Sequence, residues 1–137
     1  MSSQFQAFAN GFPVAMLHAA LVLVILVAAS ALYAVLSPAK EIGHIQDGNP
    51  AAAVSFGGGL LALAIPLAVA MMASTGLVEL GLWGAAVGLA SLIAYRIVDV
   101  LLHGLPQRVQ EGEVSAAVLL VAAKLAVAVV LASAVAG

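Results

Sequence analysis

Four long apolar stretches, separated by short polar segments, dominate the chain. They cover roughly residues 12–36, 51–74, 81–102 and 115–135. Each is close to the length of about 20 residues that an α-helix needs to cross the hydrocarbon of a bilayer. The pattern therefore predicts an all-α membrane protein with four transmembrane helices.

The polar segments after the first and third apolar stretches resemble each other. Residues 45–54 read IQDGNPAAAV, and residues 109–118, 64 positions later, read VQEGEVSAAV. Each copy ends a polar loop and starts an apolar helix. We interpret the chain as one membrane domain, 1–137, with repeat unit one at about 12–74 and repeat unit two at about 80–135. Because each unit has two spans, we expect two parallel-repeat helical hairpins with pseudo-twofold symmetry along the membrane normal.

The first polar loop, residues 37–48, contains signals for a short helix. Ser37 can N-cap it, and Gly48 can end it in the left-handed conformation. Ile42 and Ile45 would then share one face, and the charged residues would lie elsewhere. We expect a surface helix of one or two turns or a simple polar turn, and we treat residues 105–113 as the second loop.

Composition supports lipid as the solvent of this chain. Hydrophobic residues make up 65% of it and charged residues only 7%, against about 25% charged residues in soluble domains. The absence of cysteine excludes disulfides and thiolate metal sites. No basic cluster points to nucleic acid, and no nucleophile–base pair or phosphate loop appears, so we expect neither an enzyme nor a cofactor.

The few positive charges suggest an orientation. Lys40 and Arg108 lie in the two longer loops, and Arg96 lies just inside the same surface. The positive-inside rule places these loops in the cytoplasm and both termini outside.

Small residues and a proline mark the second and third spans. Gly58 and Ala62 are spaced for close helix packing, and so are three glycines of the third span, Gly81, Gly84 and Gly88. Pro66 deprives the Ala62 carbonyl of its helical donor and should kink the helix. In lipid this is tolerated only where a neighbour or water satisfies the freed carbonyl. Small faces left over after internal packing would favour a homo-oligomer.

These features together resemble a known family. The doubled helix starts, the sequences FGGG at 56–59 and IPL at 65–67, and Arg96 are similar to the DUF350 family, also called UPF0719. The likeness covers about residues 12–135. It implies a small protein of the bacterial inner membrane, built from a duplicated two-helix unit, and it implies no activity. The second unit departs from the first at Lys124, which stands opposite Leu60, and lacks the glycine triplet and the proline.

Lys124 is the sharpest candidate for chemistry, because it lies near the middle of its span. A charged lysine there costs about 2.5–3.5 kcal/mol on insertion scales. One interpretation is a lysine that lines a polar cavity or an ion path. The other is a structural lysine, either paired with Asp99 or neutral through burial.

Arg96 and Asp99, with His103, share one face at the end of the third span. Arg96 can extend to the lipid headgroups, whereas the short Asp99 needs a partner. The two residues either form an inward-facing pair that fixes helix packing or, with Lys124, make an intramembrane site for a substrate or proton.

The loops supply a second candidate surface, formed by Lys40, Glu41, His44, Asp47, Arg108 and Glu111. Its acidic residues next to helix starts have a plain explanation in the helix dipole. The histidines match no metal-binding spacing, so we expect no metal site.

Two functional hypotheses remain. The first is a small oligomeric channel or transporter for an ion or small polar solute. The alternative is a non-catalytic membrane scaffold or stress-sensor subunit that recruits a cytoplasmic protein through its two polar loops.

Overall fold

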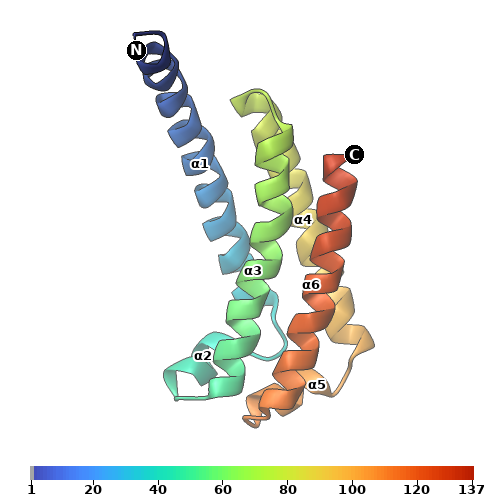
Figure 1. Cartoon of the computed structure of the whole chain (residues 1–137). Coiled ribbons are helices and arrows are strands. Elements are labelled where there is room, and N and C mark those ends of the chain that lie inside the picture. The colour runs from blue at the N-terminus through green and yellow to red at the C-terminus, as the bar shows by residue number, and fades with distance from the viewer. Residues whose placement is uncertain (1) are drawn as a thin grey trace.

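The computed structural model describes residues 2–137 as four long helices with two short helices between them (Figure 1). The long helices are α1 (Ser2–Leu36), α3 (Pro50–Ala73), α4 (Leu77–Leu101) and α6 (Val114–Ala136). The short helices are α2 (Glu41–Gln46) and α5 (Leu105–Gln110). All four long helices are long and apolar enough to cross a membrane. The predicted all-α architecture with four candidate membrane spans is thus confirmed.

The long helices run side by side, and the two short helices lie together at one end of the bundle (Figure 1). We call this the loop end. Both termini and the turn between α3 and α4 lie toward the opposite end. The most extensive contact is between α3 and α6, and α1 packs mainly on α4. The two loops therefore form one structure at one end of the bundle.

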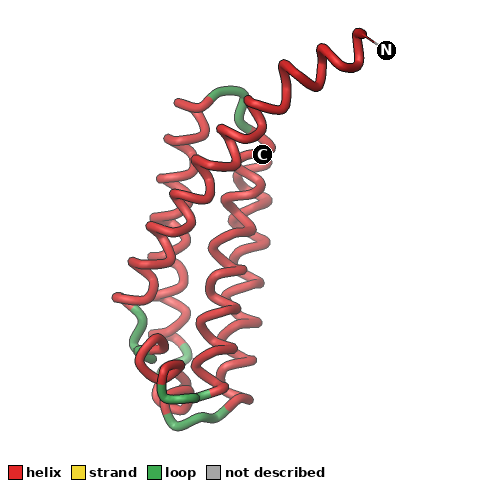
Figure 2. The backbone as a smooth tube through the Cα atoms, turned by 90° about the vertical axis from the view of Figure 1, so that its left-hand side faces the viewer, coloured by secondary structure: helices red, strands yellow, loops and turns green. Residues whose placement is uncertain are grey.

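The N-terminal half of α1 leaves the bundle (Figure 2). All residues from 2 to 17 are exposed. A helix of 35 residues is about 52 Å long, well beyond a hydrocarbon core of about 30 Å. Part of α1 must therefore tilt or extend past the core.

Two predicted helix starts were wrong. Helix α1 begins at Ser2, ten residues before the predicted span, so Pro13 lies well inside it. A proline removes one backbone hydrogen bond, and the helix continues on both sides of it. Helix α4 begins at Leu77 and not at residue 81, with Glu79 in its first turn, where an acid is favoured by the helix dipole. The starts and ends of α3 and α6 lie within one residue of prediction.

The first loop also differs from prediction. Ser37 does not cap the short helix, which begins only at Glu41, and the N-cap residue Lys40 adopts a left-handed φ of 49°. The Ser37 hydroxyl instead donates to the Glu41 carboxylate. Ile45 is half-buried, whereas Ile42 is exposed. Gly48 ends this stretch in the left-handed conformation as predicted, with φ 88°.

The repeated segments fold alike locally. Gly112 has the same φ of 88° as Gly48. In each copy the glycine N–H donates to the carbonyl three residues before it, at 2.9 Å to Ile45 and 3.0 Å to Val109. In each copy a short helix, a glycine turn and a long helix follow one another. The second loop is therefore not a plain connection, because most of it forms α5.

Asn49 and Gln110 tie the two loops together. The Asn49 Oδ1 accepts the Ala52 N–H and caps α3, while its Nδ2 donates to the carbonyls of Val109 and Gln110 at 2.8 and 3.1 Å. The Gln110 side chain donates to the Pro38 carbonyl at 2.8 Å. Side-chain hydrogen bonds thus join the first loop to the second.

Glycines permit the closest helix contacts. A Cβ at Gly58 would overlap the Val121 side chain of α6, and a Cβ at Gly59 would lie 2.6 Å from the Tyr33 hydroxyl. Of the residues predicted to pack helices, Gly58, Ala62, Gly84 and Gly88 are buried within the chain, and Gly81 is half-buried. These small residues thus serve contacts between helices of the same chain.

Pro66 and the carbonyl it frees are both buried. The Tyr95 hydroxyl of α4 donates to the Ala62 carbonyl, four residues before the proline. A neighbouring helix therefore supplies the donor that lipid could not. The kink itself stays a prediction.

Gly59→Ala should destabilise the protein by about 1–3 kcal/mol, because the added methyl overlaps a Tyr33 ring that is held in place by its own hydrogen bond. Gly57→Ala is the matched control. Nothing lies within 4 Å of a Cβ at Gly57. Replacing a helical glycine by alanine there should raise the unfolding free energy by about 0.5–1 kcal/mol. Unfolding free energies measured in detergent micelles should fall for the first variant and not for the second. Equal effects would contradict this account of Gly59.

Candidate functional site

The Lys124 ammonium lies buried where three helices meet. Its Nζ is 2.9 Å from Oδ1 of Asp99 on α4 and donates to the hydroxyl of Tyr33 on α1 at 2.6 Å. The same nitrogen lies 4.8 Å from the centroid of the Tyr33 ring. Lys124 is 1% exposed and Asp99 6%. Of the alternatives that the sequence left open, the structure shows Lys124 paired with Asp99.

The two partners of this ammonium lie near the ends of their helices. The Cα of Lys124 lies ten residues into α6, about 15 Å from the start of the helix. Its partners Tyr33 and Asp99 lie in the last turns of α1 and α4. The ammonium therefore lies beside the last turns of α1 and α4, within contact distance of both partners.

A buried ion pair is stable only with additional partners. Removing two charges from water has an effective penalty of several kcal/mol for each ion, which their attraction offsets only with good geometry and further hydrogen bonds. Here the Tyr33 hydroxyl and the face of its ring supply the added contacts. Gly59 leaves the space that the Tyr33 ring occupies.

Glu41 is a buried acid next to this pair, and its placement on the loop surface was wrong. It is 1% exposed. Its Oε1 accepts from the Ser37 hydroxyl at 2.5 Å, and its Oε2 has no hydrogen-bond partner within residues 2–137. Burial raises the pKa of this carboxyl, while the Ser37 hydrogen bond and the charge of Lys124 lower it in part. The group therefore takes up a proton more readily than an exposed glutamate.

The sequence contained a weak signal for this burial. Glu41 and Ile45 are four residues apart and share a helix face, and Ile45 is the isoleucine that packs on the core. The pairing of Ile42 with Ile45 selected the wrong face. Tyr33 has no such signal, because a tyrosine near the end of a span is also typical of the membrane–water interface.

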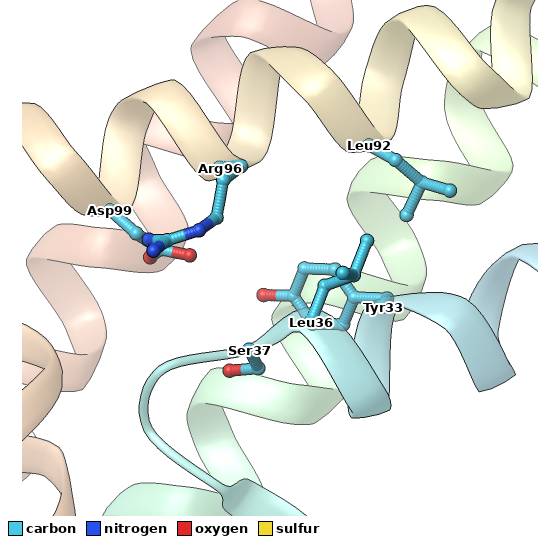
Figure 3. A pocket seen from close by; sticks show the side chains of 6 residues that line it. All are labelled: Tyr33, Leu36, Ser37, Leu92, Arg96 and Asp99. Atoms are coloured by element: carbon cyan, nitrogen blue, oxygen red, sulfur yellow. The ribbon is translucent and has the colours of Figure 1, made fainter.

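A cleft leads from the loop end to Asp99. Its volume is about 450 Å³, and its polar lining consists of Arg96, Asp99, His103, Gln107 and Gln110. A much smaller cavity of about 10 Å³ lies beside it, and Figure 3 shows Arg96 and Asp99 of α4 on one side of this cavity and Tyr33 and Ser37 on the other. The cleft thus reaches Asp99, whereas Lys124 lines neither cavity.

Arg96 lines the same two cavities as Asp99 but is not part of the buried ion pair. It is exposed, and no carboxylate forms a salt bridge with it in residues 2–137. The structure therefore brings together two of the three residues of the predicted intramembrane site as an ion pair and places the third at the rim of the cleft.

Residues 7–135 match the family described as Domain of Unknown Function (DUF350). The chain belongs to the DUF350 family. This confirms the resemblance in the sequence, and the match covers all four long helices of this DUF350 protein apart from the first residues of α1 and the last of α6. No curated protein and no solved structure matches the chain.

The remaining predicted loop residues of the DUF350 protein stay on its surface. Lys40, Asp47 and Glu111 are exposed, and His44 is half-buried. Arg108 is exposed too, but its guanidinium donates to Glu113 at 2.6 Å. The described part of the chain has no group of three side chains that could hold a metal ion.

A double-mutant cycle should measure the ion pair. Lys124→Met or Asp99→Asn alone should lower the unfolding free energy by about 3–5 kcal/mol, because each leaves one buried charge without its partner. The double variant should be more stable than either single one. Detergent unfolding titrations give the four values, and strictly additive losses would contradict a direct interaction.

Glu41→Gln should flatten the pH dependence of stability. Since the pKa of Glu41 is raised above its ordinary 4.5, the folded state holds this proton more tightly than the unfolded state. The contribution of Glu41 to the unfolding free energy should therefore be largest below pH 4.5 and fall as the pH rises through the raised pKa. Glu41→Gln should lose this decline, whereas Glu111→Gln, which changes an exposed loop acid, should keep it. Parallel curves for the wild type and Glu41→Gln would refute this role of burial.

Proposed function

We propose that this DUF350 protein belongs to the transport class, as a small oligomeric carrier or channel for an ion or small polar solute. One observation carries the proposal: a cleft of about 450 Å³ opens at the loop end and reaches Asp99, the partner of the buried Lys124. Ionisable residues inside a membrane are costly, and they commonly mark the paths of ions and protons. Lys124, Asp99 and Arg96 would line the path, and the sign of the transported charge stays open.

The packing beyond the ion pair favours a gated carrier over an open pore. Leu63, Leu92, Tyr95 and Ala128 are buried in one apolar cluster. In the arrangement described here, the proposed path is open toward the loop end and closed by this cluster. Transport would therefore need a second arrangement of the helices in which the pair separates or moves.

We further propose that the chain is one membrane domain made of two parallel repeats related by a pseudo-twofold axis. The support is local: both copies of the repeated segment form a short helix, a left-handed glycine and the start of a long helix. Lys40 and Arg108 at the loop end support a cytoplasmic location of that end, with both termini in the periplasm of a bacterial inner membrane.

A homo-oligomer remains part of this proposal, but it is now supported by a different surface. Most of the small residues predicted to pack helices are already used inside the chain. One available face is the N-terminal half of α1, which exposes Phe5, Phe8 and Phe12. Helix-to-helix packing between subunits would cover part of this long apolar surface.

The alternative proposal is a non-catalytic scaffold or stress-sensor subunit that recruits a cytoplasmic protein. It has one observation in its favour, which is that Asn49 and Gln110 join the two loops into a single surface. Exposed Lys40, Asp47 and Glu111 would then form the contact with a partner. In this case the buried ion pair would serve packing alone.

Flux measurements in proteoliposomes distinguish the two proposals. Wild-type protein should dissipate an imposed gradient of protons, potassium or chloride, as followed by a potential-sensitive dye. Lys124→Ala should abolish this flux, because the path then has an unpaired Asp99. Lys40→Ala, which removes an exposed lysine outside the cleft, should leave the flux unchanged.

The double variant Asp99→Ala with Lys124→Ala controls for misfolding of the single variant, because it removes both charges of the buried pair. It should remain folded and yet be inactive. Flux that persists in this variant, or wild-type protein that is inactive under every gradient, would contradict transport and favour the scaffold.

A further inference from the structure

The geometry points to a binding site for one anionic phospholipid between α1 and α4. The site consists of an apolar groove along the two helices and a polar cleft at its loop end, and Arg96 lies where the two meet. The inference shares Arg96 and the cleft with the proposed transport path, but it does not need that function, because it rests on the apolar groove and on the charge of Arg96 and not on the buried ion pair.

The groove has the lining that a lipid acyl chain needs. Its first part, of about 230 Å³, is lined only by apolar side chains and glycine, among them Ala28, Leu32, Ala85 and Leu89. The next part, of about 320 Å³, shares Leu32, Leu89 and Leu92 with the first and ends at Arg96. In Figure 3, Leu36 of α1 and Leu92 of α4 extend into the space between the helices. Leu92 lies one turn of α4 before Arg96.

The length of the groove fits one leaflet. From Ala85 to Arg96 the helix α4 rises by eleven residues, or about 16 Å. Half of a hydrocarbon core of about 30 Å is about 15 Å. Arg96 lies five residues before the end of α4 at Leu101, so its long side chain can reach the level of the headgroups. An acyl chain in the groove would thus place its phosphate beside the guanidinium.

The charges at the head of the groove favour an anion. Lys124 neutralises Asp99, the one carboxylate in the cleft lining. The positive charge of Arg96 is left without a carboxylate partner in residues 2–137. His103 and Gln107 line the same cleft and add possible hydrogen-bond donors. A guanidinium matches the oxygens of a phosphate with two parallel hydrogen bonds.

The occupant that joins these features is a phospholipid with a net negative headgroup. A second copy of the chain would cover the groove with an apolar helix but would leave the cation at its end unmatched. Free phosphate would match the cation but would leave the groove empty. Only a molecule with both a phosphate and an apolar chain fills both parts.

Native mass spectrometry of the detergent-purified chain tests this proposal with phosphatidylglycerol and phosphatidylcholine as probes. The wild type should retain phosphatidylglycerol in preference to phosphatidylcholine, whose phosphate charge is compensated within its headgroup. Arg96→Gln should weaken phosphatidylglycerol binding by about tenfold, in line with the loss of a charged hydrogen bond. Arg108→Gln is the matched control, because it removes an exposed arginine that lies outside the cleft and is paired with Glu113.

A second pair of variants tests the groove. Ala85→Phe fills it and leaves Arg96 in place, and it should also reduce lipid binding. Ala122→Phe adds the same ring on the exposed side of α6 and should not. Equal weakening by Arg96→Gln and Arg108→Gln would overturn the proposal and indicate only general surface charge. Competition by inorganic phosphate without an effect of Ala85→Phe would indicate a free-anion site. A changed oligomeric state with unchanged lipid binding would indicate a second copy of the chain in the groove.

Discussion

The Lys124 ammonium is the constraint on which the arrangement of the helices depends. A charge in the interior of an apolar bundle needs an opposite charge and hydrogen-bond partners. α4 supplies Asp99 and α1 supplies Tyr33. α3 supplies Gly59, which has no Cβ and therefore leaves room for the Tyr33 ring. Four helices are therefore fixed relative to one another by the requirements of one side chain, in a bundle where apolar contacts alone would discriminate poorly between neighbours and lipid.

Polar groups of the backbone inside the bundle likewise need internal partners. Pro66 frees the Ala62 carbonyl inside α3, and the Tyr95 hydroxyl of α4 donates to it. At the loop end, Asn49 satisfies the start of α3 and, through its amide nitrogen, carbonyls of the second loop. Buried polar groups in lipid have few alternatives to internal partners. Each such group consequently specifies a contact between particular helices, which the many alanines, valines and leucines of the spans cannot do.

This difference between polar and apolar residues also explains how much of the structure could be predicted from the sequence. The four spans, the left-handed Gly48 and the need for a donor at Ala62 follow from local chemistry, and all three agree with the structure. The start of α1 was missed because polar residues before an apolar span can still be helical. Glu41 and Tyr33 were missed because their burial depends on how α2 and α1 fold over the ends of other helices. A single sequence contains periodicity within a helix, but it does not state which helices face each other.

The two neighbouring charges on α4 show how a small change of position separates two roles. Arg96 and Asp99 are three residues apart, which turns the helix by about 300° and leaves their directions about 60° apart. This offset is enough to bury Asp99 against Lys124 while Arg96 stays exposed at the rim of the cleft. Asp99 and Lys124 are neutral as a pair, so the positive charge of Arg96 remains uncompensated. Substitutions at Lys124 therefore probe the interior of the bundle, and substitutions at Arg96 probe its boundary with the lipid.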